Sequence, residues 1–408
     1  MKILFFTHYY LPEGNAPASR VSALAERWVA AGHQVTVITC APNVPNGVVY
    51  DGYHNNWCSR EERNGVQVIR VWTYIVPNKG TFRRIGNYVS YWFSAFWRGL
   101  RTERPDVMIA TSPQFFCGWA GVWLHWARRI PFVLEIRDIW PESLSAVDAG
   151  LPKLLLRLIG CMEKAMYHSA DHIVTVGKGY ALKLQERNVA AEKISVIMNG
   201  VDKKIFFPRS SNRELLERYH LNGKFVCSYV GTIGMACGLK TALDVAFELK
   251  RRGNKRIVLV LVGDGAYREA LEQEARKREL DNVLFTGQRP KAEMPDWICS
   301  SDVSLVHLKK NELFTTVMPS KIFESAGCAK PIIIGVDGFA KKLVLDAKAG
   351  IPMEPENAGE LMEALLKLAD SPELCRELGQ NAYENIAKQY DRDVQARNYL
   401  EILERYKK

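Results

Sequence analysis

The chain alternates short apolar runs with longer stretches whose apolar residues recur at helical spacing. The first run covers residues 2–7, and the helix after it is expected to begin at Pro17 and to end at Gly32. Residues 34–40 form the next apolar run. A strand, a helix and a second strand in this order predict two parallel strands joined by a right-handed crossover.

The same alternation continues along the chain and falls into two series, so two open α/β sheets in tandem are expected. Glycine, proline and charge interrupt the apolar rhythm at 199–208, and we place the join there. This predicts one domain over 1–205, with 385–408 packing back on it, and a second over 206–384. The further strands are expected at 66–72, 106–111, 131–136, 171–176 and 194–198, and then at 224–230, 256–262, 283–286, 302–307 and 331–334.

The composition is that of a globular protein. With 408 residues, 47% of them hydrophobic and 25% charged, the chain is too long for one ordinary core, which agrees with two domains. Its nine cysteines are scattered and include no CxxC pair, which favours a reducing cytoplasm. The longest apolar stretch, 115–127, is shorter than the roughly 20 residues that a spanning helix needs. We expect a cytoplasmic protein without a cleavable signal or a membrane span.

The net charge of +10 favours an anionic partner: nucleic acid, an anionic bilayer or a phosphorylated substrate. No RNA- or DNA-binding signature accompanies the charge, so nucleic acid is the least favoured. The aromatic and basic stretch Thr81–Arg101 has the pattern of a helix that lies on the inner face of an anionic membrane. Apolar residues on one side equally describe a helix packed on the core, so both interpretations stay open.

Ligands of open α/β sheets bind beyond the carboxyl ends of strands, so the loops after strands are the candidate sites. Glu13-Gly14-Asn15 follows the first strand, where a glycine lets a backbone approach a phosphate. Because this is not a GxGxxG sequence, dinucleotide binding loses its main support. Gly231-Thr232-Ile-Gly234 occupies the equivalent turn of the second domain, and tight turning alone is the alternative there.

A dense cluster of ionisable groups, Glu135-Ile-Arg137-Asp138-Ile-Trp-Pro-Glu142, follows the strand at 131–136. Such groups beside tryptophan suit acid–base work or sugar binding, and a capped turn with an internal Arg–Asp pair is the alternative. The only D-x-D pair, Asp391-Arg-Asp393, is expected on a solvated helix face, far from these loops. We therefore assign no residues to a metal.

The segment Pro319-Ser-Lys321-Ile-Phe-Glu324 precedes the apolar run at 331–334. Pro319 fits the first turn of a helix and Ser320 can satisfy backbone N–H groups there, so the turn attracts anions. Lys321 adds a positive charge, and Glu324 is placed to accept from paired hydroxyls such as those of a ribose. The alternative is an exposed Lys–Glu ion pair that contributes about 0.2–0.5 kcal/mol.

Taken together, these residues resemble the family 4 glycosyltransferases, and more narrowly the bacterial surface-polysaccharide enzymes of the fucosamine transferase type. The resemblance covers nearly the whole chain, and the ordered set of motifs is more specific than any one of them. The matching segments are Glu13–Arg20, Gly32–Thr39, Arg137–Ser143, Met198–Asp202, Tyr229–Gly234, Phe285–Gly287 and Pro319–Glu324.

This resemblance implies the GT-B fold, in which two Rossmann-like doubly wound domains face a cleft and a C-terminal helix returns to the first domain. It also implies a hexosyltransferase-type enzyme that moves a sugar from a nucleotide diphosphate to a hydroxyl with retention, without an obligatory metal or other cofactor. The expected donor is a UDP-linked N-acetylated deoxysugar such as N-acetyl-L-fucosamine. The expected acceptor is a lipid-diphosphate-linked glycan in capsule or O-antigen synthesis.

The resemblance also assigns the donor to the second domain. Glu324 matches the last glutamate of the family's E-x7-E motif and should bind the ribose hydroxyls. Gly14 and the Gly231-Thr232 turn should approach the diphosphate, and the loop with Arg289 and Pro290 should meet the base.

On the acceptor and sugar side the resemblance places Glu13, Arg137 and Asp138. Asp138 falls about where many relatives carry a histidine near the reacting sugar. Departure of the diphosphate builds negative charge, and stabilising that charge is the main catalytic task. We expect Lys321 and helix N-termini to do this, and Asp138 to orient the sugar or the acceptor hydroxyl.

The chain departs from the family at several positions. Thr316 stands where the family has the first glutamate of E-x7-E, and Thr232 and Cys237 stand where it has an arginine and a lysine near the phosphates. Lys321 or Arg289 is the candidate substitute for these charges, and we prefer Lys321. The aspartate at position 138 means that the role of the family's histidine does not carry over directly.

Two other functions fit the same fold. A GT-B nucleotide-sugar epimerase would turn over its donor without an acceptor, and a non-catalytic polysaccharide-assembly protein would bind the sugar nucleotide without transfer. A hydrolase with paired carboxylates is less favoured, because no second carboxylate is evident opposite Asp138.

Overall fold

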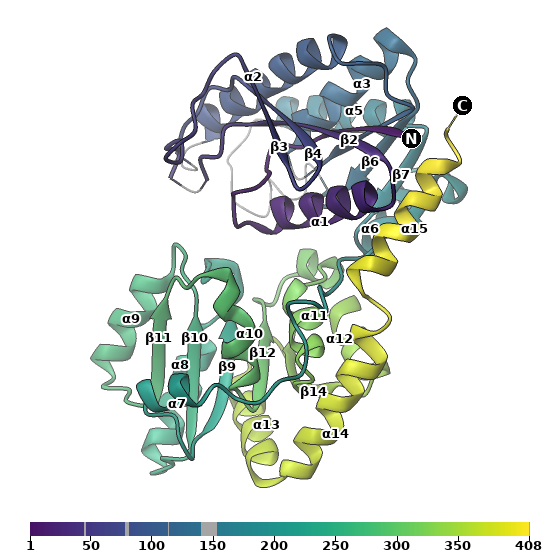
Figure 1. The fold of residues 1–408 in the computed structure, drawn as a ribbon. Coiled ribbons are helices and arrows are strands. Elements are labelled where there is room, and N and C mark those ends of the chain that lie inside the picture. The colour runs from purple at the N-terminus through teal and green to yellow at the C-terminus, as the bar shows by residue number, and fades with distance from the viewer. Residues whose placement is uncertain (45, 78–80, 113, 140–152, 408) are drawn as a thin grey trace. The chain divides into compact units, whose positions relative to one another are not determined.

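A computed structural model describes residues 1–44, 46–77, 81–112, 114–139 and 153–407. The chain divides into two compact units, Met1–Met198 with Asp393–Lys408 and Asn199–Arg392 (Figure 1). These divisions differ from the expected ones near 205 and 385. The reason is that Val201 pairs with the chain at 390–392: its N–H donates to Tyr390 O at 2.8 Å, and the N–H of Arg392 donates to Val201 O at 3.0 Å.

The first unit is built on an eight-stranded sheet in the order β3-β4-β2-β1-β5-β6-β7-β8. Neighbouring strands are parallel except for β3, which is antiparallel to β4. Helices α2, α3, α5 and α6 pack on one face, and α1 and α15 on the other. The strands are β1 Lys2–Phe6, β2 Gln34–Cys40, β3 Cys58–Arg63, β4 Val66–Val71, β5 Val107–Thr111, β6 Phe132–Ile136, β7 His172–Thr175 and β8 Ile194–Val196. The helices are α1 Ala16–Ala30, α2 Thr81–Leu100, α3 Phe115–Arg128, α5 Lys153–Ser169, α6 Lys178–Glu186, the 3-10 turn Ala191–Lys193 and α15 Arg392–Glu404.

The second unit has a six-stranded parallel sheet in the order β11-β10-β9-β12-β13-β14. Helices α8, α9 and α13 bury apolar sides against it. The strands are β9 Phe225–Val230, β10 Ile257–Val262, β11 Val283–Gly287, β12 Val303–His307, β13 Ile332–Gly335 and β14 Gly350–Pro352. The α-helices are α7 Arg213–Arg218, α8 Lys240–Arg251, α9 Arg268–Lys277, α10 Met294–Cys299, α11 Ser320–Gly327, α12 Phe339–Asp346, α13 Ala358–Asp370 and α14 Pro372–Ala382. The short turns are Met235–Cys237, Lys291–Glu293, Glu312–Thr316 and the π-helical Tyr383–Ala387.

The return of the C-terminal helix to the first unit is confirmed. Trp28 of α1 donates through Nε1 to Ala396 O of α15 at 2.9 Å, and its ring packs edge-on against Tyr399 with 5.4 Å between ring centres. Both side chains are almost fully buried. Helix α15 therefore completes the core on that face of the first sheet.

The expectation of a solvated helix face is wrong for Asp391, whereas Asp393 lies in α15 with 55% of its side chain exposed. Asp391 is buried, with 7% of its surface exposed, and its carboxylate lies 2.6 Å from Lys203 Nζ. Asp393 pairs with Arg27 of α1 at 2.5 Å. The two residues stand where the chain passes from one unit to the other, and each carboxylate pairs with a lysine or arginine of its own unit.

Helix α2 packs on the core through Tyr88, Tyr91 and Ala95, which supports the core-packed interpretation for that side of the helix. Phe93 and Trp97 lie on the opposite side and are 44% and 54% exposed. Among the described residues, no helix is both long and apolar enough to cross a membrane.

Mild acid is expected to destabilise the first unit through two buried histidines. Burial lowers the pKa of His8 to about 3 and that of His172 to about 4, against about 6.5 in an unfolded chain. Between pH 6.5 and 5 the unfolded chain therefore binds more protons than the folded protein. The free energy of unfolding falls by about 1.4 kcal/mol for each histidine when the pH is lowered by one unit. Urea unfolding followed by tryptophan fluorescence measures this slope.

A matched pair of variants separates the two buried histidines from the rest of the chain. His8→Gln and His172→Gln should each reduce the slope by about 1.4 kcal/mol per pH unit, the share of one histidine. An unchanged slope in His8→Gln would contradict the assignment.

Candidate functional site

Two glycines meet at the carboxyl edge of the second sheet. Gly231 follows β9 with φ 131°, and a Cβ at this position would lie 2.0 Å from Lys321 Nζ. Gly263 follows β10, and a Cβ there would lie 2.1 Å from Gly231 O. At Gly263 the clash is with backbone, so glycine is required there; at Gly231 the Cβ would meet only the end of the lysine side chain, and the φ of 131° is what disfavours other residues.

Lys321 projects into this turn from the start of α11. Its Nζ lies 4.5 Å from the centre of the Tyr229 ring and makes no hydrogen bond or ion pair with any described residue. Burial lowers the pKa of Lys321, and the nearby Glu324 and Cys237 oppose that effect. The Lys–Glu surface pair considered from the sequence is not formed, because no ion pair within 4.0 Å joins Lys321 to Glu324.

The N-terminus of α11 has no side-chain cap. The N-cap residue is Pro319, with an extended backbone at ψ 131°, and Ser320 is the first helical residue. The expectation that Ser320 satisfies the first N–H groups is therefore wrong, since neither it nor any other side chain in the described part of the chain accepts from them. Uncapped N–H groups and the helix dipole favour a bound anion at this place, beside the amine of Lys321.

Glu324 lies one turn further along α11 and is partly buried. Its carboxylate forms no hydrogen bond with a described residue, and the positive charges that it influences are Lys321 and Lys291. The carboxylate is thus open to accept hydrogen bonds from outside the protein, as the ribose assignment requires.

His307, which the sequence argument missed, holds the glycine loop in place. This last residue of β12 is buried, its Nδ1 lies 2.8 Å from Cys237 O, and its Nε2 accepts from the N–H of Glu356 at 2.9 Å. Burial lowers its pKa, so the ring is neutral and Nδ1 is the donor. One signal in the sequence could have identified His307: it is a histidine at the end of an apolar strand.

Thr232, Cys237 and Thr316, which stand where the family has charged residues, make hydrogen bonds within the protein. The carbonyl of Thr232 accepts from Tyr229 Oη at 2.7 Å and from Cys237 Sγ at 3.3 Å. Thr316 is buried and donates to Leu313 O at 3.0 Å. None of these side chains supplies a charge to a ligand.

The loop with Arg289 and Pro290 is tied to a different part of the unit. Arg289 Nη2 donates to Tyr219 Oη at 2.5 Å, and Tyr219 packs on Trp297. Pro290 is exposed and begins the short turn Lys291–Glu293. Among the described residues no contact joins Arg289 to Lys321, which leaves Lys321 as the cation at the glycine turn.

Glu13, predicted on the acceptor side, holds a loop of the first unit. It is 2% exposed and accepts from the N–H groups of Asn43 at 2.9 Å and Val44 at 3.2 Å, and from Asn15 Nδ2 at 3.2 Å. Burial raises its pKa. Gly14, beside it, is exposed with open space where a Cβ would stand, so the fold itself does not demand glycine there.

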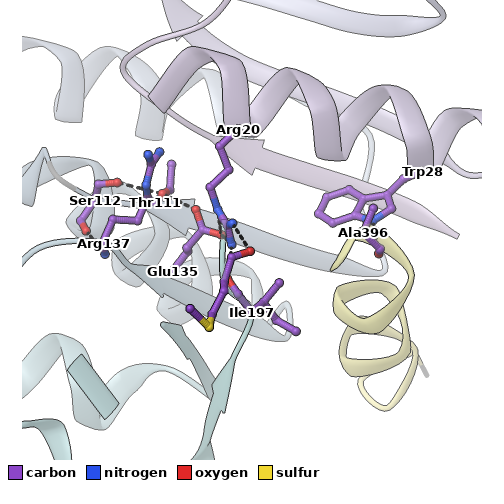
Figure 2. A network of polar contacts seen from close by, with 9 residues as sticks. Arg20, Trp28, Thr111, Ser112, Glu135, Arg137, Ile197 and Ala396 are labelled. Carbon is purple, nitrogen blue, oxygen red and sulfur yellow. Dashed lines mark hydrogen bonds and ion pairs between the residues drawn. The ribbon is translucent and has the colours of Figure 1, made fainter. Parts of the chain in front are cut away.

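The cluster after β6 contains an ion pair that the sequence did not predict. Glu135, fully buried, pairs with Arg20 of α1 at 3.0 Å, and Arg20 also donates to the carbonyls of Ile197 and Met198 (Figure 2). Burial alone would raise the pKa of Glu135. The positive charges of Arg20 and Arg137, and the hydrogen bonds that Glu135 accepts from Arg20 and Thr111, hold this pKa below its usual value. The two partners are 115 residues apart in sequence, so no local pattern reveals them.

Arg137 and Asp138 lie next to this pair. Asp138 is partly buried, and its Oδ1 accepts from the N–H of Ile139 at 3.1 Å. The remainder of the motif, residues 140–143, lies outside the described residues. The structure therefore gathers Arg137 and Asp138 with Glu135 at one edge of the first sheet, while Glu13 serves the loop after β2.

Replacing Gly231 by alanine is expected to weaken nucleotide binding about 10- to 100-fold. The new methyl group would displace the Lys321 amine, and the φ of 131° adds backbone strain of about 1–3 kcal/mol. Calorimetric titration with UDP measures the affinity. Gly223→Ala is the control, because Gly223 also has a positive φ of 72° but open space around it, and equal losses in both variants would contradict a specific role for the turn.

Comparison with known proteins agrees with this geometry. Residues 15–200 match the family model described as a glycosyl transferase 4-like domain, and residues 212–385 match that of glycosyl transferases group 1. The putative colanic acid biosynthesis glycosyl transferase WcaI of Escherichia coli K12 is 25% identical, over 97% of this chain and 100% of that protein. The probable glycosyltransferase WbjE of Pseudomonas aeruginosa is 25% identical over 66% of this chain and 68% of its own.

Two solved structures show the same fold. Sucrose-phosphate synthase from Thermosynechococcus elongatus superposes with a TM-score of 0.79 at 16% identity, over 99% of this chain and 98% of that one. Anabaena Alr3699/HepE in complex with UDP and glucose superposes with a TM-score of 0.73 at 18% identity, over 99% of both chains.

Two Rossmann-like units with these matched domains define a GT-B glycosyltransferase, an enzyme that takes its sugar from a nucleotide-linked donor. More particularly, residues 15–200 form a glycosyl transferase 4-like domain and residues 212–385 a domain of the glycosyl transferases group 1.

Proposed function

We propose that the protein is a retaining glycosyltransferase of polysaccharide synthesis that uses a UDP-linked sugar. The proposed donor sugar is an N-acetylated deoxysugar such as N-acetyl-L-fucosamine, and the proposed acceptor is a lipid-diphosphate-linked glycan of capsule or O-antigen. The names of WcaI, a colanic acid enzyme, and of the UDP complex of Alr3699/HepE support these choices. The proposal includes no metal and no cofactor.

One observation carries the donor assignment. Lys321 presents an amine that pairs with no carboxylate of a described residue, at the uncapped start of α11 and against the Gly231 turn, with the open carboxylate of Glu324 one turn further. Positive charge and free N–H groups suit the diphosphate, and a carboxylate suits paired ribose hydroxyls. In the proposed reaction the lysine stabilises the charge of the departing diphosphate.

Binding of a panel of UDP-, GDP- and dTDP-sugars to the full-length chain tests the donor. We expect a UDP-sugar to bind most tightly and Glu324→Ala to weaken it about 10-fold or more, since one or two charge-assisted hydrogen bonds are lost. Glu363→Ala, which changes an exposed glutamate of α13 in the same unit, is the control. Binding of no nucleotide sugar, or equal binding by Glu324→Ala and the wild type, would refute the donor site.

Incubation of the enzyme with its donor, with and without a polyprenyl-diphosphate glycan, tests the reaction. Transfer requires the acceptor, and the product should keep the anomeric configuration of the donor, as read by NMR. Isomerisation of the donor without acceptor would instead identify an epimerase. Tight binding with no conversion in either mixture would identify a non-catalytic assembly protein.

A lipid-linked acceptor requires access to a membrane, and one face of the first unit suits that need. Helix α3 packs beside both α2 and α5, and exposed apolar side chains occur on all three. The exposed fraction is 54% for Trp97, 55% for Trp126, 78% for Leu154 and 55% for Leu158. Arg101, whose guanidinium lies 5.9 Å from the Trp97 ring, adds positive charge. Aromatic and basic side chains together favour an anionic lipid interface.

Flotation with vesicles tests this contact. The wild type should float with vesicles rich in phosphatidylglycerol more than with phosphatidylcholine vesicles, and Trp97→Ser with Trp126→Ser should reduce flotation severalfold. Trp57→Ser, which changes an exposed tryptophan at the antiparallel edge of the sheet, is the control. Equal flotation of both variants would contradict the proposed face.

A further inference from the structure

The loop Gly231–Gly238, which follows β9, is closed on itself and lies beside Lys321. Cys237 Sγ donates to Thr232 O at 3.3 Å, which joins the two halves of the loop. A Cβ at Gly231 would touch Lys321 Nζ. Burial lowers the pKa of that amine, and Cys237, at the other end of the loop, is near enough to raise it. Both ends of the loop therefore lie at the same amine.

The end of β12 holds two carbonyl groups in the second half of this loop. The N–H of Lys309 donates to Ala236 O at 2.9 Å, and His307 Nδ1 donates to Cys237 O at 2.8 Å. The N–H of Glu356 donates to His307 Nε2 at 2.9 Å, so the proton of the neutral ring is on Nδ1. The bond from Lys309 belongs to the backbone, whereas the bond from His307 belongs to a side chain and can be removed by substitution.

Two glycines make room for the His307 ring. A Cβ at Gly238 would lie 2.7 Å from His307 Cε1, and a Cβ at Gly335 would lie 2.4 Å from His307 Cδ2. Gly238 also has a φ of 61°, a conformation that other residues rarely adopt. The ring is therefore confined between the glycine loop and the end of β13, and its hydrogen bond to the loop has little freedom to move.

The bond from His307 also fixes the direction of the next N–H along the chain. The peptide between Cys237 and Gly238 is trans, and in a trans peptide the C=O and the N–H point in opposite directions. The N–H of Gly238 therefore points away from the ring. It makes no hydrogen bond within the described part of the chain. Because hydrogen bonds in series polarise one another, donation from His307 to the carbonyl strengthens this N–H as a donor.

We propose that the N–H of Gly238 donates a hydrogen bond to the anion bound beside Lys321, and that His307 is the positioning residue that keeps this N–H in place through the Cys237 carbonyl. The anion is a phosphate or diphosphate group. That it is the diphosphate of a nucleotide sugar rests on the proposed function. In this arrangement Lys321 supplies the charge, and the oriented peptide supplies a directed hydrogen bond.

NMR of the full-length chain tests the hydrogen bond directly. Inorganic pyrophosphate, and separately UDP-glucose, should shift the amide proton of Gly238 downfield and slow its exchange with solvent, because a new hydrogen bond forms. The amide of Gly223, a glycine of the same unit with a positive φ of 72°, is the control and should not respond. If only pyrophosphate moves the Gly238 proton, the contact stands and the proposed UDP-sugar donor falls. If neither ligand moves it, the inference is refuted.

Two substitutions of His307 separate its two hydrogen bonds. In His307→Asn the amide nitrogen takes the place of Nδ1, so the bond to Cys237 O is kept and the bond from Glu356 is lost. In His307→Gln the amide oxygen takes the place of Nε2, so the bond from Glu356 is kept and the bond to Cys237 is lost. Titration with pyrophosphate should show affinity about 3- to 10-fold lower in His307→Gln, the contribution of one hydrogen bond, and within about twofold of the wild type in His307→Asn.

A purely structural role for His307 would give a different pattern. Both variants would then lower the unfolding temperature with unchanged affinity for pyrophosphate, or would lose the same affinity, and either result overturns the positioning role. His220→Gln changes an exposed histidine of the same unit and should alter neither quantity. Affinity that is lost in His307→Gln and kept in His307→Asn, together with a Gly238 proton that responds only where affinity is kept, is the expected result.

Discussion

Replacing Lys321 by methionine is expected to slow sugar transfer about 10²- to 10³-fold, the usual cost of removing one group that stabilises transition-state charge. The amine stands against the Gly231 turn and no other described cation contacts that turn. Without it, the charge of the departing diphosphate is met only by helix N–H groups. Stability should not fall by more than about 1 kcal/mol, because the amine makes no ion pair and loses only its contact with Tyr229.

Rapid-quench measurement of donor consumption in a single turnover gives the rate of the chemical step, and thermal unfolding gives the stability. Lys342→Met is the matched control, because that lysine is exposed and pairs with Asp346 at the surface at 3.1 Å. A near-normal rate for Lys321→Met would remove the lysine from the mechanism. A lower rate together with a large loss of stability would assign it to the fold instead.

Replacing Glu135 by alanine is expected to destabilise the first unit by about 3–5 kcal/mol, the range seen when one partner of a buried ion pair is removed. The change leaves the buried guanidinium of Arg20 without a carboxylate and removes the nearest negative charge from Arg137. Replacing both Arg20 and Glu135 by leucine should recover part of the loss, because neither charge is then left alone.

Tryptophan fluorescence during urea unfolding measures the stability of the first unit, which contains Glu135, since all but one of the ten tryptophans precede residue 199. Glu103→Ala is the control: its pair with Lys2 is exposed and should contribute less than about 1 kcal/mol. A loss below that value in Glu135→Ala, or a double variant no more stable than the single one, would contradict the assigned role of the pair.

Most of the fold could be predicted because strands buried on both faces are nearly continuous apolar runs. Strands β9 and β10 are examples, with almost every residue buried. Strand β3 was missed because it is a polar edge strand, Cys58–Arg63, whose residues are exposed or half-buried and carry four charges. The three-residue β14 was missed because its length gives no periodicity. The boundary lies at the start of the interrupted stretch 199–208, a few residues before 205, because Val201 pairs with Tyr390, a contact between distant segments that no local pattern reveals.

The candidate site was predictable where it depends on strand ends and helix starts. The rule that ligands bind beyond strand ends selected Gly231, and the pattern of a helix start selected Lys321; the structure brings the two side by side. The rule says nothing about which polar side chains the protein itself uses. The hydrogen bonds of Glu13 and the positioning role of His307 became visible only with their partners in place.

The charged strand β3 has a consequence for how this enzyme meets other copies of itself. Its arginines and glutamates alternate in exposure along one border of the first sheet, and the opposite border is the three-residue β8. Neither border offers the long apolar edge on which a further strand could be added. Growth into fibres by strand addition is thereby opposed at this sheet, and any self-association of the first unit is expected to use its helices.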